Sequence, residues 1–175
     1  MTYRQEPKIV QGSRLEDSLQ EAIIEEAKKI LEQKKSSHSL VECAMLSRFG
    51  LDIAFFIHQH DRPGIRFLEL KAYTGSRPRG VGFGNSKGEG TEVDLLLLED
   101  SQLNLADQFI GWILVDGTKP IGSKRFVIFN NNEAKNSAMG GVERGKQSNL
   151  RVSTLMPNAI SWDDLSKELE SFLES

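Results

Sequence analysis

The chain has 175 residues, of which 38% are hydrophobic and 27% are charged, a composition typical of globular proteins. This length suffices for one α/β domain with a sizeable core, so we predict a single domain over residues 1–175. The formal net charge of −3 excludes a generally basic nucleic-acid coat protein, and no apolar run is long enough for a membrane span. The only cysteine is Cys43, which excludes an intramolecular disulfide, and residues 1–7 contain no apolar stretch of a secretion signal. We therefore expect a cytoplasmic protein.

Charge is distributed unevenly along the chain. Residues 62–87 contain six basic residues and one acid, and residues 118–151 contain seven basic residues and two acids. The terminal segments carry most of the remaining acids. Basic loops on an acidic scaffold could contact phosphate, and the alternative is a surface on which scattered charges are simply solvated.

The first predicted element is an amphipathic helix that begins at Ser13, where Glu16 completes a capping box. Apolar residues then recur at spacings of three and four up to Leu31, and the helix should end near residues 34–37. The following segment, residues 39–49, is compatible with either a short helix or an irregular connection.

Two strands are predicted next, over residues 51–57 and 65–73, because both segments are rich in Ile, Phe and Leu. The polar break between them ends in Pro63-Gly64, a turn signal, so the strands should pair as an antiparallel hairpin. Both strands are apolar on both faces, as expected in a sheet covered by helices.

The rest of the chain alternates between polar segments and apolar elements. Residues 76–90 are glycine-rich and predict a mobile basic loop, and residues 130–153 predict a long flexible segment. Residues 91–99 predict a strand in preference to a helix, and residues 100–107 predict a short helix. Strands are predicted over 109–116 and 124–129. The last element is a helix over 161–174, where Ser161 and Asp164 form a capping box. This order predicts a mixed sheet flanked by helices.

Three charged residues interrupt the two apolar strands of the hairpin. Strand periodicity places Glu69 and Lys71 on one face, and the hairpin brings the start of the first strand, at Asp52, beside them. Charges in such strands are costly unless they are paired or bind a metal. Two close carboxylates repel each other, and Mg²⁺ would relieve that repulsion, with the Leu70 carbonyl as a further oxygen ligand. Lys71 could orient or deprotonate an attacking water and stabilise charge on a phosphate.

This arrangement resembles the PD-(D/E)xK nuclease superfamily, whose signature here is Asp52 followed by Glu69-Leu70-Lys71. The segment from Gly12 to Glu16 is similar to the start of the first helix in archaeal Holliday-junction resolvases, where Gly-Ser-x-x-Glu supplies a third acid. The resemblance implies a restriction-endonuclease-like αβββαβ core over about residues 12–130, with 130–153 and 161–174 as additions. It also implies that Glu16 supports the metal site.

The chain departs from the family pattern at three places. Leu51 stands where the family name has proline, residues 36–50 form a longer connection, and a glycine-rich insertion follows Tyr73. These departures argue against junction resolution more than against nuclease chemistry.

The resemblance leads us to expect a Mg²⁺-dependent DNA endonuclease, with Mn²⁺ able to substitute. Asp52, Glu69 and the Leu70 carbonyl would hold the metal, Lys71 would serve the nucleophilic water, and cleavage of both strands would favour a homodimer. The expected DNA contacts are Arg77, Arg79, Lys87, Arg144, Lys146 and Arg151. Two alternatives stay open. One is a catalytically inactive DNA-binding protein of the same fold, and the other is a phosphate-binding module built on Gly80-x-Gly82-x-Gly84.

Overall fold

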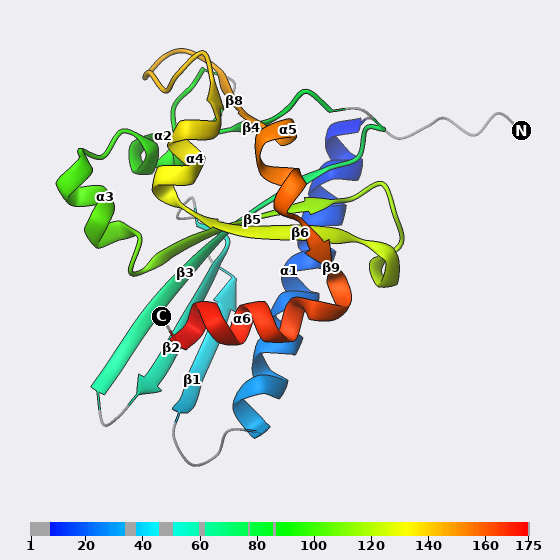
Figure 1. Ribbon diagram of the computed structural model, residues 1–175, viewed down its shortest axis with the longest axis vertical. Helices are drawn as coiled ribbons and strands as arrows, with labels where there is room; N and C mark the ends of the chain where they lie inside the picture. The colour runs from blue at the N-terminus through cyan, green and yellow to red at the C-terminus, as the bar shows by residue number, and fades with distance from the viewer. Residues whose placement is uncertain are drawn as a thin grey trace, which may run out of the picture.

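A six-stranded mixed sheet forms the centre of the computed structural model, which describes residues 8–33, 38–45, 51–59, 62–76, 78–85 and 87–174 (Figure 1). The strands lie in the order β1-β2-β3-β5-β6-β9. Their bounds are β1 His38–Met45, β2 Ile53–Gln59, β3 Arg62–Tyr73, β5 Ile110–Asp116, β6 Arg125–Asn130 and β9 Ile160–Ser161. Neighbouring strands are antiparallel except β3 and β5, which run parallel. The chain from β3 to β5 therefore crosses over one face of the sheet.

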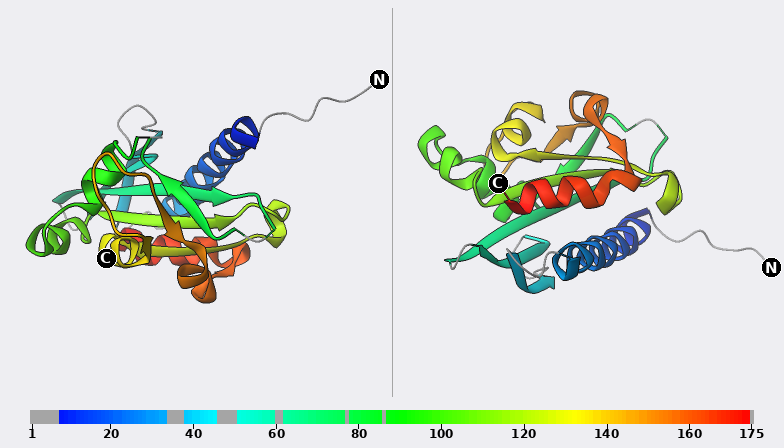
Figure 2. Two further views of the ribbon diagram at one scale, coloured as in Figure 1. Left: turned by 90° about the horizontal axis from the view of Figure 1, so that it is seen from above. Right: turned by 60° about the horizontal axis from the view of Figure 1, so that its bottom comes forward.

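Helices cover both faces of this sheet. The two longest, α1 (Lys8–Gln33) and α6 (Leu165–Glu174), lie side by side on one face (Figure 2). The opposite face is covered by α2 (Thr91–Leu96), α4 (Asn131–Ser137), α5 (Val152–Leu155) and a small sheet of order β4-β8-β7. The small sheet consists of β4 Gly80–Phe83, β8 Ser148–Arg151 and β7 Ala138–Met139. The remaining elements are α3 Asp100–Ala106 and the 3₁₀ turns η1 Ile121–Ser123, η2 Met156–Asn158 and η3 Trp162–Asp164.

The two faces of the sheet enclose two hydrophobic cores, and alternate residues of β5 enter each of them. Ile113 and Val115 pack with the α1 and α6 side chains, whereas Trp112 and Leu114 pack under the small sheet. Burial of apolar side chains on both faces explains why the strand is apolar throughout. Within the described residues, no helix combines the length and the apolar character that crossing a membrane requires.

The predicted α/β architecture with a mixed sheet is confirmed, as are the short helix near 100–107 and the strands near 109–116 and 124–129. The first helix spans Lys8–Gln33 and so includes residues before Ser13; residues 34–37, where we expected its end, lie outside the described residues. Ser13 therefore lies inside the helix and is not its cap. At the C-terminus, Ser161 caps the 3₁₀ turn η3 by accepting a hydrogen bond from the Asp163 amide, and α6 begins only at Leu165.

Three predictions of local structure were wrong. The segment that we left open between helix and irregular connection contains strand β1, which pairs with β2. Residues expected as a strand form α2, because Val93 and Leu96 are buried at helical spacing. Pro63-Gly64 is not the hairpin turn but part of β3, opposite His58 and Ile57, and the pairing continues to Gln59 with Arg62; residues 60–61 lie outside the described residues.

The two segments expected to be flexible are largely folded against each other. Gly80–Phe83 forms β4 and pairs with β8, and the side chains of Phe83 and Leu150 are buried in the second core. Most of residues 130–153 forms α4, β7 and β8, and Asn130 begins α4 with a capping box that includes Glu133. The apolar residues scattered through these polar segments explain why they fold.

Candidate functional site

The candidate site lies at a step in the sheet, where β3 continues beyond its neighbour β2. The first pair of β2 with β3 is Ile53 with Leu68, so Asp52 lies just before β2 and opposite Glu69. Beyond this point, the residues from Leu70 to Tyr73 pair with β5 on one side, and no described residue pairs with them as a strand on the other. On the other edge of β3, side chains of Asp52 and of α1 reach the backbone.

Two backbone amides on this edge of β3 donate hydrogen bonds to acidic side chains. The Leu70 amide donates to Oδ2 of Asp52 at 2.6 Å, and the Ala72 amide donates to Oε1 of Glu16 at 3.4 Å. The other oxygen of Asp52 accepts a hydrogen bond of 2.9 Å from Nε2 of Gln20, which is 5% exposed. Glu16 and Gln20 are four residues apart on α1 and therefore lie on the same face of that helix. Asp52 is thus held through both of its carboxylate oxygens.

Glu69 and Lys71 project from the opposite face of β3 to Leu68 and Leu70, which are buried in the first core. Nζ of Lys71 lies 2.6 Å from Oε1 of Glu69 and 3.1 Å from Oε1 of Glu92, the second residue of α2. Glu69 is 2% exposed, and its Oε2 has no hydrogen-bond partner in the described part of the chain. A buried carboxylate oxygen without a partner is costly, so this oxygen is available to a ligand.

Burial and mutual repulsion shift the pKa values of these acids. Burial raises the pKa of Glu69 to about 8, although Lys71 opposes the shift, and Asp52 adds to it. Burial also raises the pKa values of Asp52 and Glu16 above their usual range, against the opposing effects of Lys71 and of the Leu70 and Ala72 amides. These three acids thus resist ionising together, which is the condition that a bound cation would relieve.

The pKa values of Lys71 and Glu92 shift in the directions that favour the charged forms of both side chains. Burial alone would lower the pKa of Lys71, but the carboxylates of Glu69 and Glu92 outweigh burial and hold that pKa above its usual value. Burial likewise opposes ionisation of Glu92, but Lys71 and nearby backbone amides outweigh it and lower the pKa of Glu92. Lys71 is therefore an ammonium held between the side chains of Glu69 and Glu92, which lie on different elements.

The structure brings together the residues that the motif singled out, Asp52, Glu69, Lys71 and Glu16, with Leu70 between them. Sequence reasoning missed Gln20 and Glu92. The position of Gln20, one helical turn after Glu16, was a usable signal. Glu92 gave no such signal, because the segment that carries it was expected to be a strand.

Two of the basic segments predicted to bind DNA lie side by side. Strand pairing places Gly80, next to Arg79, opposite Arg151, and the Gly145 amide donates to the Gly88 carbonyl at 3.2 Å. The predicted contacts on these segments are all exposed: Arg79, Lys87, Arg144, Lys146 and Arg151. Arg77 lies outside the described residues.

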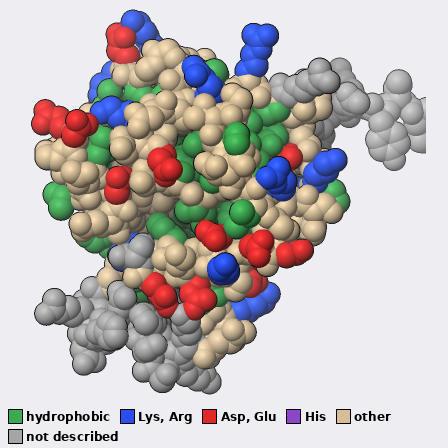
Figure 3. Space-filling model, in the orientation of Figure 1, with side chains coloured by type: hydrophobic (Ala, Val, Ile, Leu, Met, Phe, Trp, Pro, Cys, Tyr) green, Lys and Arg blue, Asp and Glu red, His purple; other side chains and the backbone are tan. Residues whose placement is uncertain are grey.

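The charge of this surface is partly balanced. Arg144 pairs with Asp94 of α2, and Lys146 pairs with Glu143 at 2.7 Å. Figure 3 shows acidic and basic side chains interspersed over one face of the molecule, without a continuous basic patch. Any contact with nucleic acid would therefore depend on local groups more than on a general positive field.

The pattern Gly80-x-Gly82-x-Gly84, which we considered as a phosphate-binding loop, belongs partly to a β-strand. Gly80 and Gly82 lie within β4, paired with β8. Gly88 has φ +69°, and a Cβ there would lie 2.0 Å from the Lys146 carbonyl oxygen, so only glycine allows the two segments to approach this closely.

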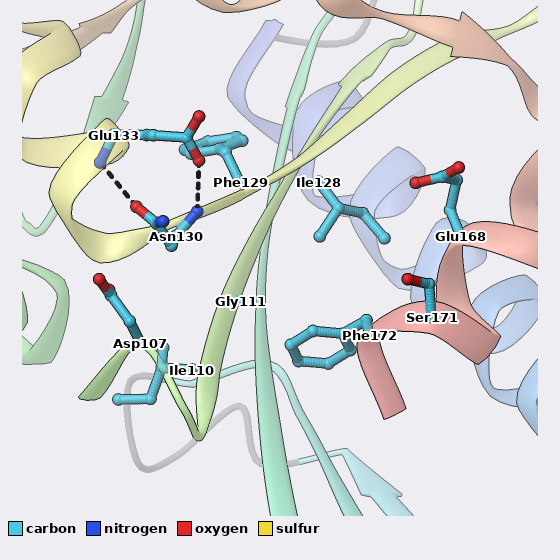
Figure 4. Close-up of a pocket in the computed structure, with 10 residues that line it drawn as sticks. All are labelled: Asp107, Ile110, Gly111, Ile128, Phe129, Asn130, Glu133, Glu168, Ser171 and Phe172. Atoms are coloured by element: carbon cyan, nitrogen blue, oxygen red, sulfur yellow. Dashed lines mark hydrogen bonds between the residues drawn. The ribbon is translucent and has the colours of Figure 1, made fainter. Parts of the chain in front are cut away.

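A separate pocket of about 270 Å³ lies between β5, β6 and α6 (Figure 4). Its acids include Asp107 and Glu133, which accept hydrogen bonds from the backbone amides of Asn131 and Asn130 at 3.0 Å each. These two carboxylates thus serve the start of α4. None of the motif residues lines this pocket.

Among the residues that the structure describes, no group of three or more His, Cys, Asp or Glu side chains is arranged as a ready metal site. The Lys71 ammonium contacts Oε1 of Glu69, so this oxygen already has a partner. Comparison with known proteins identifies no relative, because no protein-family model, no curated protein and no solved structure matches the chain.

Proposed function

We propose that the chain is a Mg²⁺-dependent DNA endonuclease of the restriction-endonuclease-like fold. The convergence of Asp52, Glu69 and Lys71 at the point where the described pairing of β2 with β3 begins is the observation that carries the proposal. The element order supports an αβββαβ core, since α1 precedes the antiparallel strands β1, β2 and β3, and β5 then returns parallel to β3.

The chemistry of the cluster fits a hard divalent cation. Glu69 and Glu92 contact Lys71, whereas Glu16 and Asp52 interact with it electrostatically, and the buried Oε2 of Glu69 has no partner among the described residues. The Leu70 carbonyl lies on the same edge of β3 as the Leu70 amide, which faces Asp52. Asp52, Glu69 and this carbonyl would hold the cation through oxygen atoms, the ligands that Mg²⁺ and Mn²⁺ prefer.

A bound Mg²⁺ would supply the positive charge that activates water and stabilises the negative charge developing on a phosphodiester. Lys71 would hold the attacking water or a phosphate oxygen with its ammonium protons. Glu16 and Gln20 would act from α1, Glu16 by supporting the cation and Gln20 by fixing the orientation of Asp52.

The exposed cations of the small sheet and its turns support DNA as the substrate. They lie on segments that pack beside α2, the helix that delivers Glu92 to the site. Phosphate contacts by such side chains would make binding salt-dependent. Cleavage of both strands would require two sites, so we propose a homodimer as the cleaving species.

A plasmid-nicking assay tests the proposal. The wild-type protein should nick supercoiled DNA with Mg²⁺ or Mn²⁺ and should not do so in EDTA. Asp52→Ala and Lys71→Ala should each abolish nicking while retaining the circular-dichroism spectrum of the wild type. Glu21→Gln, which changes an exposed acid on α1, is the control. Nicking that survives in both site variants would contradict the assignment.

One observation favours the alternative of a catalytically inactive DNA-binding protein. The 2.6 Å ion pair of Lys71 with Glu69 can close the position that a cation would need. Such a protein would bind DNA with salt-dependent affinity, but would leave it uncut with either cation. Parallel gel-shift and nicking measurements at the same salt concentration distinguish the two functions.

A further inference from the structure

We propose that Glu92 is a positioning residue of the site, which holds the Lys71 ammonium in place from outside the Glu-x-Lys motif. The inference rests on the proposed function, because it assigns a role to a residue of that same site. It also gives a role to the segment that follows the glycine-rich strand β4, because that segment leads into α2, which carries Glu92.

The first support is the placement of Lys71 between two carboxylates. Its Nζ is 2.6 Å from Glu69 and 3.1 Å from Glu92, and the Lys71 and Glu92 side chains are only 13% and 15% exposed. A cation held by Glu69 would compete with Lys71 for that carboxylate. Glu92, which lies on a different element, would then be the partner that keeps the buried ammonium paired.

The second support is the rigid attachment of Glu92 itself. Its neighbour Val93 is buried in the second core together with Leu96, which anchors α2 to the sheet. Gly84 has φ +70°, and a Cβ there would lie 2.7 Å from Cγ2 of Val93. The glycine-rich segment can therefore pack closely against the start of α2, and Glu92 is presented to Lys71 by a fixed helix and not by a free loop.

This geometry predicts a defined kinetic effect. Without the contact to Glu92, Lys71 would keep only its contact with Glu69. The water or phosphate oxygen that Lys71 binds would then be misplaced. Misplacement of a reacting group by about 1 Å can cost on the order of 100-fold in rate. We expect kcat to fall by about 10- to 100-fold in a Glu92 variant, with little change in KM.

Two substitutions separate position from charge. Glu92→Gln keeps the length of the side chain and removes its charge, whereas Glu92→Asp keeps the charge but withdraws the carboxylate by one methylene. Both should lower kcat if the fixed contact matters. Glu89→Gln, an exposed glutamate three residues earlier, is the matched control and should behave as the wild type.

A second readout does not depend on nuclease activity. Side-chain NMR of the Lys71 ε-methylene group in the cation-free full-length protein should show restricted motion in the wild type and Glu89→Gln. It should show increased motion in both Glu92 variants, with chemical shifts of the second core unchanged. Increased motion of Lys71 in these variants supports the positioning role even if the wild type cuts no DNA. Absence of cleavage by the wild type would refute only the proposed function.

Three outcomes would overturn the role of Glu92. One is unchanged Lys71 order in both Glu92 variants. Another is wild-type kcat in both variants of a protein that cleaves DNA. The third is full activity and full Lys71 order in Glu92→Asp with loss of both in Glu92→Gln, because that pattern would assign the effect to charge and not to a fixed contact.

Discussion

Asp52 is held by donors from two different elements, the Leu70 amide of β3 and the Gln20 side chain of α1. Both hydrogen bonds are partly buried, since Gln20 and Leu70 are buried and Asp52 is half-buried. Residues that orient a metal ligand in this way affect affinity without touching the metal. Substitution of Gln20 therefore tests directly whether Asp52 is a metal ligand.

Replacing Gln20 by Leu keeps a side chain of similar size and removes the hydrogen bond to Asp52. We expect the affinity for Mn²⁺ to fall by at least about 10-fold, as is usual for such supporting residues. Isothermal titration calorimetry measures the change, and Glu21→Gln on the next, exposed position of α1 is the control. Equal Mn²⁺ affinity in Gln20→Leu and the wild type would argue against Asp52 as a ligand.

The sequence was sufficient to bring the residues of the motif together. Period-two alternation placed Glu69 and Lys71 on one face, and the hairpin placed Asp52 beside them, both of which the strand register bears out. The role of Glu92 could not be predicted from the sequence, because its approach to Lys71 depends on how α2 packs against the sheet. Long-range packing of this kind leaves no periodic trace in the sequence.

The glycine-rich segment and the turn around Lys146 form one unit at the scale of elements. Gly88 lies against the backbone of Lys146, and β4 pairs with β8 directly beside this contact. The same unit carries the exposed cations proposed to contact DNA and leads into α2. Its docking should thus matter for stability and for the site.

Gly88→Ala should disrupt this docking. The added Cβ would clash with the Lys146 carbonyl at a positive φ that alanine rarely adopts, so we expect a loss of about 1–3 kcal/mol in the free energy of unfolding. Urea denaturation measures the loss. Gly75→Ala is the control, because a Cβ there meets nothing within 4 Å. Equal stability of the two variants would contradict the close packing of the segments.

Prediction of elements succeeded where hydrophobic periodicity was strong and failed where burial came from tertiary packing. β5 and α3 were predicted because their patterns are self-contained. β4 and β8 were not, since each has four residues with only one or two apolar side chains in the second core. Short strands in polar segments become stable only through the partner that pairs with them.

At the scale of the whole molecule, the acid cluster couples stability to pH and to divalent cations. The pKa of Glu69 is about 8 in the folded protein and near 4.5 for an ordinary glutamate, so the folded state retains a proton that the unfolded state releases between these values. Stability in the absence of a cation should therefore fall as pH rises through this window. Glu16 and Asp52 contribute with the same sign, and Glu92, whose pKa is lowered, contributes with the opposite sign at acidic pH.

We predict a loss of roughly 2–4 kcal/mol in the free energy of unfolding between pH 5 and pH 8 in EDTA. Because a cation must displace the proton from Glu69, Mn²⁺ should raise Tm more at pH 8 than at pH 6. Thermal denaturation across this range measures both effects, and Glu69→Gln should flatten the pH dependence and remove the Mn²⁺ effect. Stability that rises steadily from pH 5 to pH 8 without a cation would be inconsistent with a buried, protonated Glu69.

The central claim is that Asp52 and Glu69 hold a divalent cation beside Leu70 of β3. A crystal structure of the wild-type protein soaked with Mn²⁺ tests it most directly, through the anomalous scattering of the metal. We predict an anomalous peak within ligand distance of both carboxylates and of the Leu70 carbonyl, with Lys71 moved away from Glu69 and still paired with Glu92. A site without an anomalous peak, closed by an unchanged ion pair of Lys71 with Glu69, would contradict it.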